Sequence, residues 1–408
     1  MKNIKIFLAL FSLACIVLAC GEEEKGGTVK PSAITDYEVT PINGGAIITY
    51  AIPKDPNIMC VTAEYTRNGE PYLERSSAYN NSLRVEGFKT TDPVTVTLYT
   101  QNRSEDHSDP LTITFTPLKS LVDLAKESLE FTTSFGGLNM SWENISNTEL
   151  NIHLMAFVDG EMTKDDIYFS TLSEDKRSYR GYDAVETDFA ITIGDKWGNI
   201  SDTAHYYTTP LFEMEVPKPW GDMRTYAIGD NTTEFLATHV FTNIFDGKIG
   251  TTGWLCIAGS AGCSFTLDFK EVFKLSRYKF WPSLRSGIVG DVYGNVNITE
   301  FEIWGSAVFD TDKPASYWAD NEDPTGTFKE DWEYLGYFIR ERLDLQGATN
   351  DEIWQRGAVD GDEWELPLEL GPVRYIRFYC RATADGKPVP NNYWQLGELS
   401  FFGSNRIN

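Results

Sequence analysis

The residue with the most definite chemistry is Cys20, whose thiol follows the small residue Ala19 at the end of an apolar run. The run covers residues 4–20, and Lys2 and Lys5 give it a positively charged start. It is shorter than the roughly 20 apolar residues that cross a membrane as a helix. This pattern predicts a secretory signal with its cleavage site before Cys20.

A second kind of chemistry is sugar binding, in which aromatic rings stack on the apolar face of a sugar and a few polar groups fix its hydroxyls. Such residues must lie on loops, and the last third of the chain carries aromatic, arginine and asparagine side chains in predicted loops. For each of them the alternative is a place in the core. The candidate carbohydrate-binding residues are Trp281, Arg285, Tyr293, Asn295, Trp318, Trp220 and Arg224.

Two cysteines bracket a turn of small residues, in the segment Cys256-Ile-Ala-Gly-Ser-Ala-Gly-Cys263. In an oxidising compartment they could form a disulfide across a hairpin. The alternative is a pair of buried thiols. The two-residue cysteine spacing of metal sites is absent from the chain.

Residues for catalysis are not arranged in any recognisable pattern. The four histidines are scattered, without the spacing of a zinc site or a Ser-His-Asp triad. Carboxylates are so frequent that Asp360, Asp362 and Glu363 do not identify a glycosidase pair. We therefore expect a protein that is not an enzyme.

The chain is strongly acidic, with 60 acidic against 35 basic residues and a net charge of −25. Such a surface repels nucleic acid, and no basic patch with interleaved aromatic residues is present, so we expect no nucleic-acid partner. The same charge argues against a polyanionic glycan, unless a local basic loop overrides it.

The sequence around the cleavage site, Val17-Leu18-Ala19-Cys20, resembles the lipobox of bacterial lipoproteins. This resemblance implies that residues 1–19 are a lipoprotein signal peptide and that Cys20 is acylated on its thiol and its new amino group. Each buried methylene adds about 0.8 kcal/mol, so several acyl chains anchor the chain stably in a membrane. The alternative is an ordinary signal peptide followed by an incidental cysteine.

Residues 20–30 contain three glutamates in a row and several glycines, and they should form a flexible acidic tether. They resemble the export signal that directs lipoproteins of Bacteroidota to the outer face of the outer membrane. The alternative is a solvated spacer. The expected location is therefore the outer membrane, with a lipid anchor and the chain facing the cell exterior.

The elements that position these residues are predicted to be β-strands. Short segments rich in Val, Ile, Thr, Tyr and Phe recur between Gly, Asn, Asp and Pro clusters, and Val94–Tyr99 alternates cleanly. One exception is a short helix that Thr349 would cap, with Asp351 and Glu352 in its first turn. The fold class is therefore all-β.

An internal repeat divides the first half of the chain. Gly44–Tyr50 matches Gly136–Trp142, and the later Thr116-Pro117-Leu118 matches Thr209-Pro210-Leu211. A period near 90 residues is that of one small sandwich domain. The two units, 31–118 and 119–216, resemble fibronectin type III or immunoglobulin-like domains, and Tyr50 and Trp142 are expected in their cores.

The remaining residues, 219–408, form a third predicted domain. Phe245-Asp246-Gly247 with the following Thr and Trp, and the terminal Gly397–Gly403 strand, resemble the discoidin (factor V/VIII C-type) domain and the galactose-binding jelly rolls of family 32 carbohydrate-binding modules. The resemblance implies a discoidin-like jelly-roll β-sandwich after the two immunoglobulin- or fibronectin III-like sandwiches.

In relatives that bind a structural cation, oxygens of the Asp-Gly turn and the Glu of the last strand converge on it. The matching positions here imply a Ca²⁺ site, because hard oxygen ligands suit that ion. The alternative is an aspartate that only caps its turn and a glutamate that faces solvent. The candidate metal ligands are Asp246, Lys248, Thr251, Thr252 and Glu398.

Over residues 30–408 the chain also resembles three-domain surface lipoproteins of Bacteroidota. Their expected role is to bind a poly- or oligosaccharide beside an outer-membrane glycan importer, and so to capture glycans for polysaccharide utilisation. We expect the same of this chain, through its C-terminal domain. The alternative is an adhesion or assembly module whose C-terminal domain binds a protein, since discoidin-like domains also bind proteins and lipids.

Overall fold

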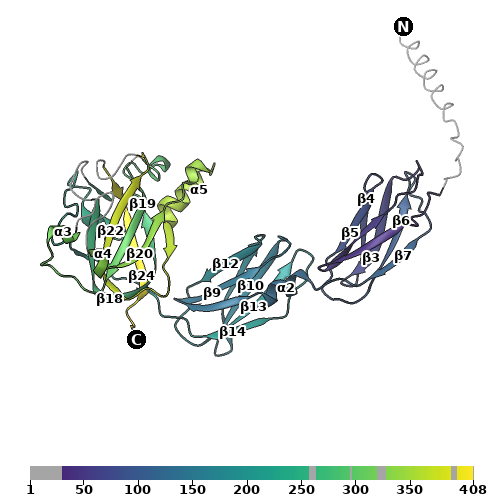
Figure 1. Ribbon diagram of the computed structural model, residues 1–408, viewed down its shortest axis with the longest axis horizontal. Coiled ribbons are helices and arrows are strands. Elements are labelled where there is room, and N and C mark those ends of the chain that lie inside the picture. The colour runs from purple at the N-terminus through teal and green to yellow at the C-terminus, as the bar shows by residue number, and fades with distance from the viewer. Residues whose placement is uncertain (1–29, 257–262, 295, 319–327, 387–392, 408) are drawn as a thin grey trace, which may run out of the picture. The chain divides into compact units, whose positions relative to one another are not determined.

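The computed structural model describes residues 30–407 apart from 257–262, 295, 319–327 and 387–392 (Figure 1). Strands dominate the described chain and helices are short, so the prediction of an all-β fold is confirmed. Two compact units can be distinguished. Unit 1 contains the chain up to residue 130, with 141–176 and 189–206, and unit 2 contains 131–140, 177–188 and the chain from 207 on. The predicted signal peptide and Cys20 lie outside the described residues.

The first sandwich lies within unit 1 and has two antiparallel sheets. One sheet has the order β1-β2-β5 and the other β4-β3-β6-β7. Alternating apolar residues of the two sheets, such as Ile48 and Val61, are fully buried in one core. The strands are β1 (Tyr37–Ile42), β2 (Gly45–Tyr50), β3 (Cys60–Arg67), β4 (Glu70–Ser77), β5 (Ser82–Glu86), β6 (Val94–Gln101) and β7 (Leu111–Phe115).

A second set of sheets follows the short helix α2 (Leu121–Glu127), which Ser120 caps. The sheet orders are β12-β9-β8 and β11-β10-β13-β14. Trp142 of β9 is buried, as Tyr50 of β2 is, and the prediction that both are core residues is confirmed. The strands are β8 (Glu130–Ser134), β9 (Gly137–Glu143), β10 (Leu150–Val158), β11 (Glu161–Ser170), β12 (Glu174–Tyr179), β13 (Thr187–Asp195) and β14 (Ala204–Thr208).

The repeated residues build the same turn twice. Gly44 and Gly136 both have φ near +64°, a conformation that glycine adopts without strain. The amide of Gly44 donates to the carbonyl of Leu118, and the amide of Gly136 donates to that of Leu211. Each repeat is therefore closed by the leucine of its own Thr-Pro-Leu sequence.

The third segment lies in unit 2. Its large sheet has the order β15-β24-β18-β22-β19-β20, and β17 and β23 form a separate pair. The strands are β15 (Met214–Glu215), β16 (Gly221–Asp222), β17 (Trp254–Leu255), β18 (Ser264–Trp281), β19 (Ile298–Ser306), β20 (Glu333–Ile339), β21 (Asp362–Glu365), β22 (Val373–Thr383), β23 (Gln395–Leu396) and β24 (Glu398–Ser404).

The long strand β18 connects the two layers of this segment. Its first half pairs with β22, and its second half pairs with β24 and β21. A register shift separates the halves, and Lys270 between them has a positive φ of 72°. Aromatic side chains fill the core beneath, where the rings of Phe301 and Phe378 stack with centroids 4.6 Å apart.

Short helices lie outside the sheets: α3 (Ala315–Trp318), α4 (Phe328–Asp331) and α5 (Asn350–Trp354). The predicted cap of α5 is confirmed, because the Thr349 hydroxyl accepts from the amide of Glu352 while the Glu352 carboxylate accepts from the amide of Thr349. A π-helix of residues Gln355–Asp360 continues α5.

Candidate functional site

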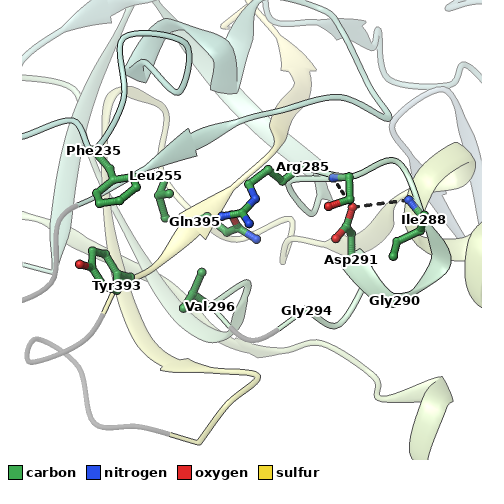
Figure 2. A pocket seen from close by; sticks show the side chains of 11 residues that line it. Phe235, Leu255, Arg285, Ile288, Gly290, Asp291, Gly294, Val296, Tyr393 and Gln395 are labelled. Atoms are coloured by element: carbon green, nitrogen blue, oxygen red, sulfur yellow. Dashed lines mark hydrogen bonds between the residues drawn. The ribbon is translucent and has the colours of Figure 1, made fainter.

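A pocket of about 460 Å³ opens at the end of the third segment where β18 ends and β23 begins (Figure 2). Two aromatic rings line one side of it and a polar loop lines the other. The lining residues are Phe235, Leu255, Arg285, Ser286, Ile288, Gly290, Asp291, Gly294, Val296, Tyr393 and Gln395.

Backbone hydrogen bonds to β17 and β23 position the walls of the pocket. Leu255 of β17 pairs with Gln395 of β23, and the amide of Phe235 donates to the carbonyl of Leu255. On its other side, the amide of Gln395 donates to the carbonyl of Val296 at 2.8 Å. Three segments far apart in sequence are thus held side by side by one short strand.

The polar loop, residues 282–297, is closed at its base by Asn297, which is fully buried. Its side chain accepts from the amide of Ser283 at 2.9 Å and donates to the carbonyls of Ser283 and Asp291. Further along the loop, the Asp291 carboxylate accepts from the amide of Ser286 at 2.6 Å. Because these polar groups are satisfied within the loop, its shape is set before any ligand arrives.

A buried ion pair anchors this loop from below. The Arg340 guanidinium lies 2.6 Å from the Asp362 carboxylate and also donates to the carbonyls of Val292 and Ile298. Both charged side chains are at most 1% exposed. Tyr293 of the loop donates its hydroxyl to the carbonyl of Glu341 at 2.6 Å, which adds a second attachment.

The aromatic side of the pocket is formed by Phe235 and Tyr393. Their rings meet edge to face with centroids 5.3 Å apart, and they stay 41% and 37% exposed. Figure 2 shows the Arg285 side chain between this pair and Asp291. The site thus presents an apolar platform next to hydrogen-bonding groups, which is the arrangement that holds a sugar ring.

His239 lies beside this site, and its pKa depends on the charge of Arg285. The imidazole is buried, its Nδ1 lies 3.0 Å from the Thr238 hydroxyl, and its Nε2 has no hydrogen-bond partner among the described residues. Burial lowers the pKa of His239, and the positive charge of Arg285 lowers it further. A neutral imidazole is therefore favoured at physiological pH.

Of the seven predicted sugar-binding residues, the structure places Arg285 in the pocket. Tyr293 lies on the same loop, but its hydroxyl is used to attach that loop. Trp281 is buried at the end of β18, where its indole N–H donates to the carbonyl of Val359 at 3.2 Å. Asn295 lies outside the described residues.

The other three predicted residues are part of the core or of an internal ion pair, and the prediction that they meet a sugar is corrected. Trp318 is 1% exposed and stacks on Phe309 with ring centroids 5.0 Å apart. Trp220 is buried against Phe401. Arg224 is buried and pairs with Asp222 at 2.8 Å. Burial of the large apolar indoles of Trp318 and Trp220 stabilises the fold, which accounts for their place in the core.

Phe235, Tyr393 and Gln395 were missed from the sequence. Tyr393 follows Asn391-Asn392, and Phe235 follows Thr232-Thr233-Glu234. An aromatic residue next to small polar residues is typical of a loop, so a signal was present for these two residues. The sequence does not show that the segments of Phe235 and Tyr393 lie next to each other in the fold.

The predicted calcium ligands are brought together in part. Glu398 of β24 is 1% exposed, and its carboxylate accepts from the amide of Gly247 in the Asp246 turn at 3.3 Å. The cation next to Glu398 is, however, the Lys218 ammonium, which also lies 2.9 Å from the Ser400 hydroxyl and 3.3 Å from the Glu215 carboxylate.

The remaining predicted ligands are also engaged within the protein. Asp246 accepts from the amide and the ammonium of Lys248, both at 2.9 Å, and the Thr251 hydroxyl donates to the Lys248 carbonyl. The Thr252 carbonyl accepts from Asn243. Since Ca²⁺ takes six to eight oxygens, these residues as placed do not fit the ion. Within the described ranges, no three His, Cys, Asp or Glu side chains are grouped to hold a metal.

We therefore expect the melting temperature of the chain to be the same in excess EDTA and in excess Ca²⁺. An ion present at 100 times its dissociation constant would stabilise the fold by about 2.7 kcal/mol, which moves a melting temperature by several degrees. Differential scanning calorimetry in the two buffers, with Mg²⁺ as the control, measures this. A saturable rise with Ca²⁺ alone would show that the folded chain binds this ion.

The predicted disulfide between Cys256 and Cys263 is not found. Both thiols are buried, and the structure does not join them. Burial raises the pKa of the Cys256 thiol to about 12, which keeps it protonated. The alternative of two buried thiols is the one that the structure supports. Among the described residues, no helix is long and apolar enough to cross a membrane.

Three family models match successive segments of the chain. A Domain of unknown function (DUF4959) matches residues 31–117, another (DUF5126) matches 118–219, and a third Domain of unknown function, DUF5000, matches 245–403. No curated protein matches the chain in sequence.

Several solved structures are similar to parts of this chain. A SusE-like protein is 21% identical with a TM-score of 0.37, and the match covers 70% of this chain and 99% of that one. Two fibronectin type III domains of chicken tenascin are 13% identical with a TM-score of 0.22, covering 44% and 99%. CBM32-1 from a family 31 glycoside hydrolase of Clostridium perfringens is 11% identical with a TM-score of 0.25, covering 42% and 88%. Segment by segment, this chain is therefore similar to three domain families of unknown function that follow one another from residue 31 to residue 403.

Proposed function

We propose that the chain is a non-catalytic surface protein that binds a carbohydrate in the pocket between Phe235, Arg285 and Tyr393. The observation that carries this proposal is an exposed edge-to-face aromatic pair in a pocket that also holds a guanidinium and amide groups. An aromatic pair next to hydrogen-bonding groups can stack on the apolar face of a sugar ring while those groups bind its hydroxyls. At about 460 Å³, the pocket lies within the range of sites for small ligands.

The polar side of the pocket supports sugar hydroxyls better than an apolar ligand. Arg285 offers donors, and Gln395 offers both a donor and an acceptor at the base of the pocket. The loop that carries Arg285 is fixed by Asn297 and Arg340, so little conformational entropy is lost when a ligand binds. A shallow, preformed site of this kind fits millimolar to micromolar affinity, about −4 to −8 kcal/mol.

The location in this proposal rests on the N-terminal sequence. A lipid on Cys20 and the acidic tether would hold the sandwiches and the pocket outside the outer membrane, and the sandwich domains would act as spacers. A glycan captured there would pass to an outer-membrane importer. Metabolic labelling of Cys20 with a fatty acid, and protease accessibility on whole cells, test the anchor and the exposure.

We expect Phe235→Ala and Tyr393→Ala each to weaken glycan binding by about tenfold, the equivalent of 1.4 kcal/mol. The measurement is titration calorimetry of the chain without its predicted signal peptide and with Cys20→Ser, against a broad glycan panel. Tyr79→Ala is the matched control, because that tyrosine is fully exposed on the first sandwich and lies outside the pocket.

A panel without any binding partner would contradict the carbohydrate function and favour a protein ligand. Binding that survives both aromatic substitutions would place the carbohydrate site elsewhere on the chain.

A further inference from the structure

Arg285 carries a charge that no carboxylate balances among the described residues. Most other arginines of the segment are paired, and Arg340, Arg374 and Arg377, for example, lie 2.6, 2.7 and 2.8 Å from a carboxylate oxygen. In a chain with a net charge of −25, a carboxylate partner is readily available to most cations. An exposed arginine that lines a pocket without such a partner is therefore poised to meet an anion from outside.

The one carboxylate that lines the same pocket is used by the loop itself. Asp291 accepts from the amides of Ser286 and Ile288 (dashed lines in Figure 2), and no ion pair joins it to Arg285 among the described residues. Two backbone amides on one carboxylate hold it in place, which keeps it from turning toward the guanidinium. The loop thus separates the negative group from the positive one.

We propose that the ligand of this pocket is an acidic sugar, whose carboxylate or sulfate ester pairs with the Arg285 guanidinium while its ring lies against Phe235 and Tyr393. This inference rests on the proposed carbohydrate function and adds the charge of the sugar. A guanidinium presents a planar fork of donors that matches an oxyanion with two hydrogen bonds. A neutral sugar would leave that charge without a partner in the bound state.

The negative charge of the whole chain does not prevent such binding. At physiological ionic strength, charges more than about 8 Å apart are largely screened, so the groups within the pocket decide. Arg285 acts at contact distance, where the pocket walls exclude part of the solvent and strengthen the ion pair. Arg285 therefore outweighs the overall charge within the pocket. The negative charge of the chain disfavours extended, unspecific contacts with a polyanion, but it does not prevent the binding of one acidic residue of such a chain.

The test compares matched ligands that differ in charge. Oligogalacturonate is titrated against its methyl-esterified form, glucuronic acid against glucose, and dextran sulfate against dextran, with the chain that carries Cys20→Ser. We expect at least one acidic member to bind about tenfold or more tightly than its neutral partner, and Arg285→Gln to remove that difference. Arg103→Gln is the control, since Arg103 is exposed in the first sandwich and its loss changes the net charge equally.

The outcomes separate this inference from the proposed function. Equal binding of acidic and neutral partners, unaffected by Arg285→Gln, overturns the acidic ligand and leaves carbohydrate binding in place. The absence of binding by every member of the panel overturns both. Preference for the sulfated pair alone, or for the uronic acids alone, identifies which oxyanion the pocket takes.

His239 gives a second readout that does not depend on affinity. An oxyanion on Arg285 cancels the positive charge that lowers the His239 pKa, so this pKa should rise when an acidic ligand binds. Arg285→Gln should raise it without any ligand, whereas a neutral sugar should leave it unchanged. NMR titration of ¹³C-labelled histidine follows this shift, and with four histidines in the chain His239→Gln assigns the signal.

Discussion

Asp362→Ala should destabilise the C-terminal segment by about 3–5 kcal/mol, because it leaves the Arg340 guanidinium buried without a counter-charge. Both side chains are at most 1% exposed, and one guanidinium nitrogen of Arg340 already has no hydrogen-bond partner among the residues that the structure describes. Asp362 also accepts from Arg356 at 3.0 Å, so one carboxylate holds two cations. The loss of stability would be much smaller if either charged side chain were exposed to water.

Urea denaturation followed by tryptophan fluorescence measures this effect, because nine of the eleven tryptophans lie after residue 219. Asp360→Ala is the matched control: that aspartate lies two residues away, is exposed and should change stability by less than about 0.5 kcal/mol. Replacing both partners with apolar residues, Arg340→Met with Asp362→Leu, should recover much of the loss. An Asp362→Ala protein within about 1 kcal/mol of the parent would contradict the buried ion pair.

The same substitution should affect the pocket. Arg340 holds the carbonyl of Val292, which lies in the loop of Arg285 and Asp291. When the ion pair is broken, the loop loses its hydrogen bond to Arg340, and no residue of the loop itself takes the place of that contact. Ligand binding should therefore weaken in Asp362→Ala even at a urea concentration of zero, whereas the control Asp360→Ala should bind as the parent does.

The sandwich domains could be predicted from the sequence because their signals are local. Strand alternation depends on neighbours two residues apart, and the repeat of Gly44 and Gly136 depends on a positive φ that each turn needs by itself. The cap of α5 at Thr349 is equally local. None of these features requires knowledge of which distant strands pair.

Of the pocket residues, only Arg285 could be predicted, because the pocket depends on contacts between segments that are distant in sequence. Phe235 and Tyr393 meet because β17 and β23 pair, and that pairing is set by the tertiary fold. Trp281 and Trp318, which the sequence places in loops, were misleading, since their burial depends on what packs over them from elsewhere in the chain. The surroundings of Glu398 are equally non-local: Lys218 lies 180 residues before Glu398, and only the fold brings the ammonium to the carboxylate.

Lys218→Ala should cost about 3–5 kcal/mol of stability at neutral pH, because it removes the cation next to a glutamate that is 1% exposed. Within the described part of the chain, one oxygen of Glu398 already has no hydrogen-bond partner. In the variant, the other oxygen would keep only the amide of Gly247 as a donor among these residues. Lys248→Ala is the control, since that lysine is 71% exposed, pairs with Asp246 in the same turn and should cost less than about 1 kcal/mol.

The pH dependence identifies Glu398 as the cause of this loss. Burial raises the pKa of Glu398 above its ordinary value of 4.5, and Lys218 opposes that rise, so removing the lysine raises the pKa further. The folded variant then binds a proton more tightly than the unfolded chain, and its stability increases as the pH falls through the folded pKa toward 4.5. The gap between parent and variant should therefore narrow in denaturation curves recorded from about pH 8 to about pH 5. A gap that stays constant would mean that the lysine acts through its contact with Trp220, whose ring centroid lies 5.5 Å from the ammonium, rather than through Glu398.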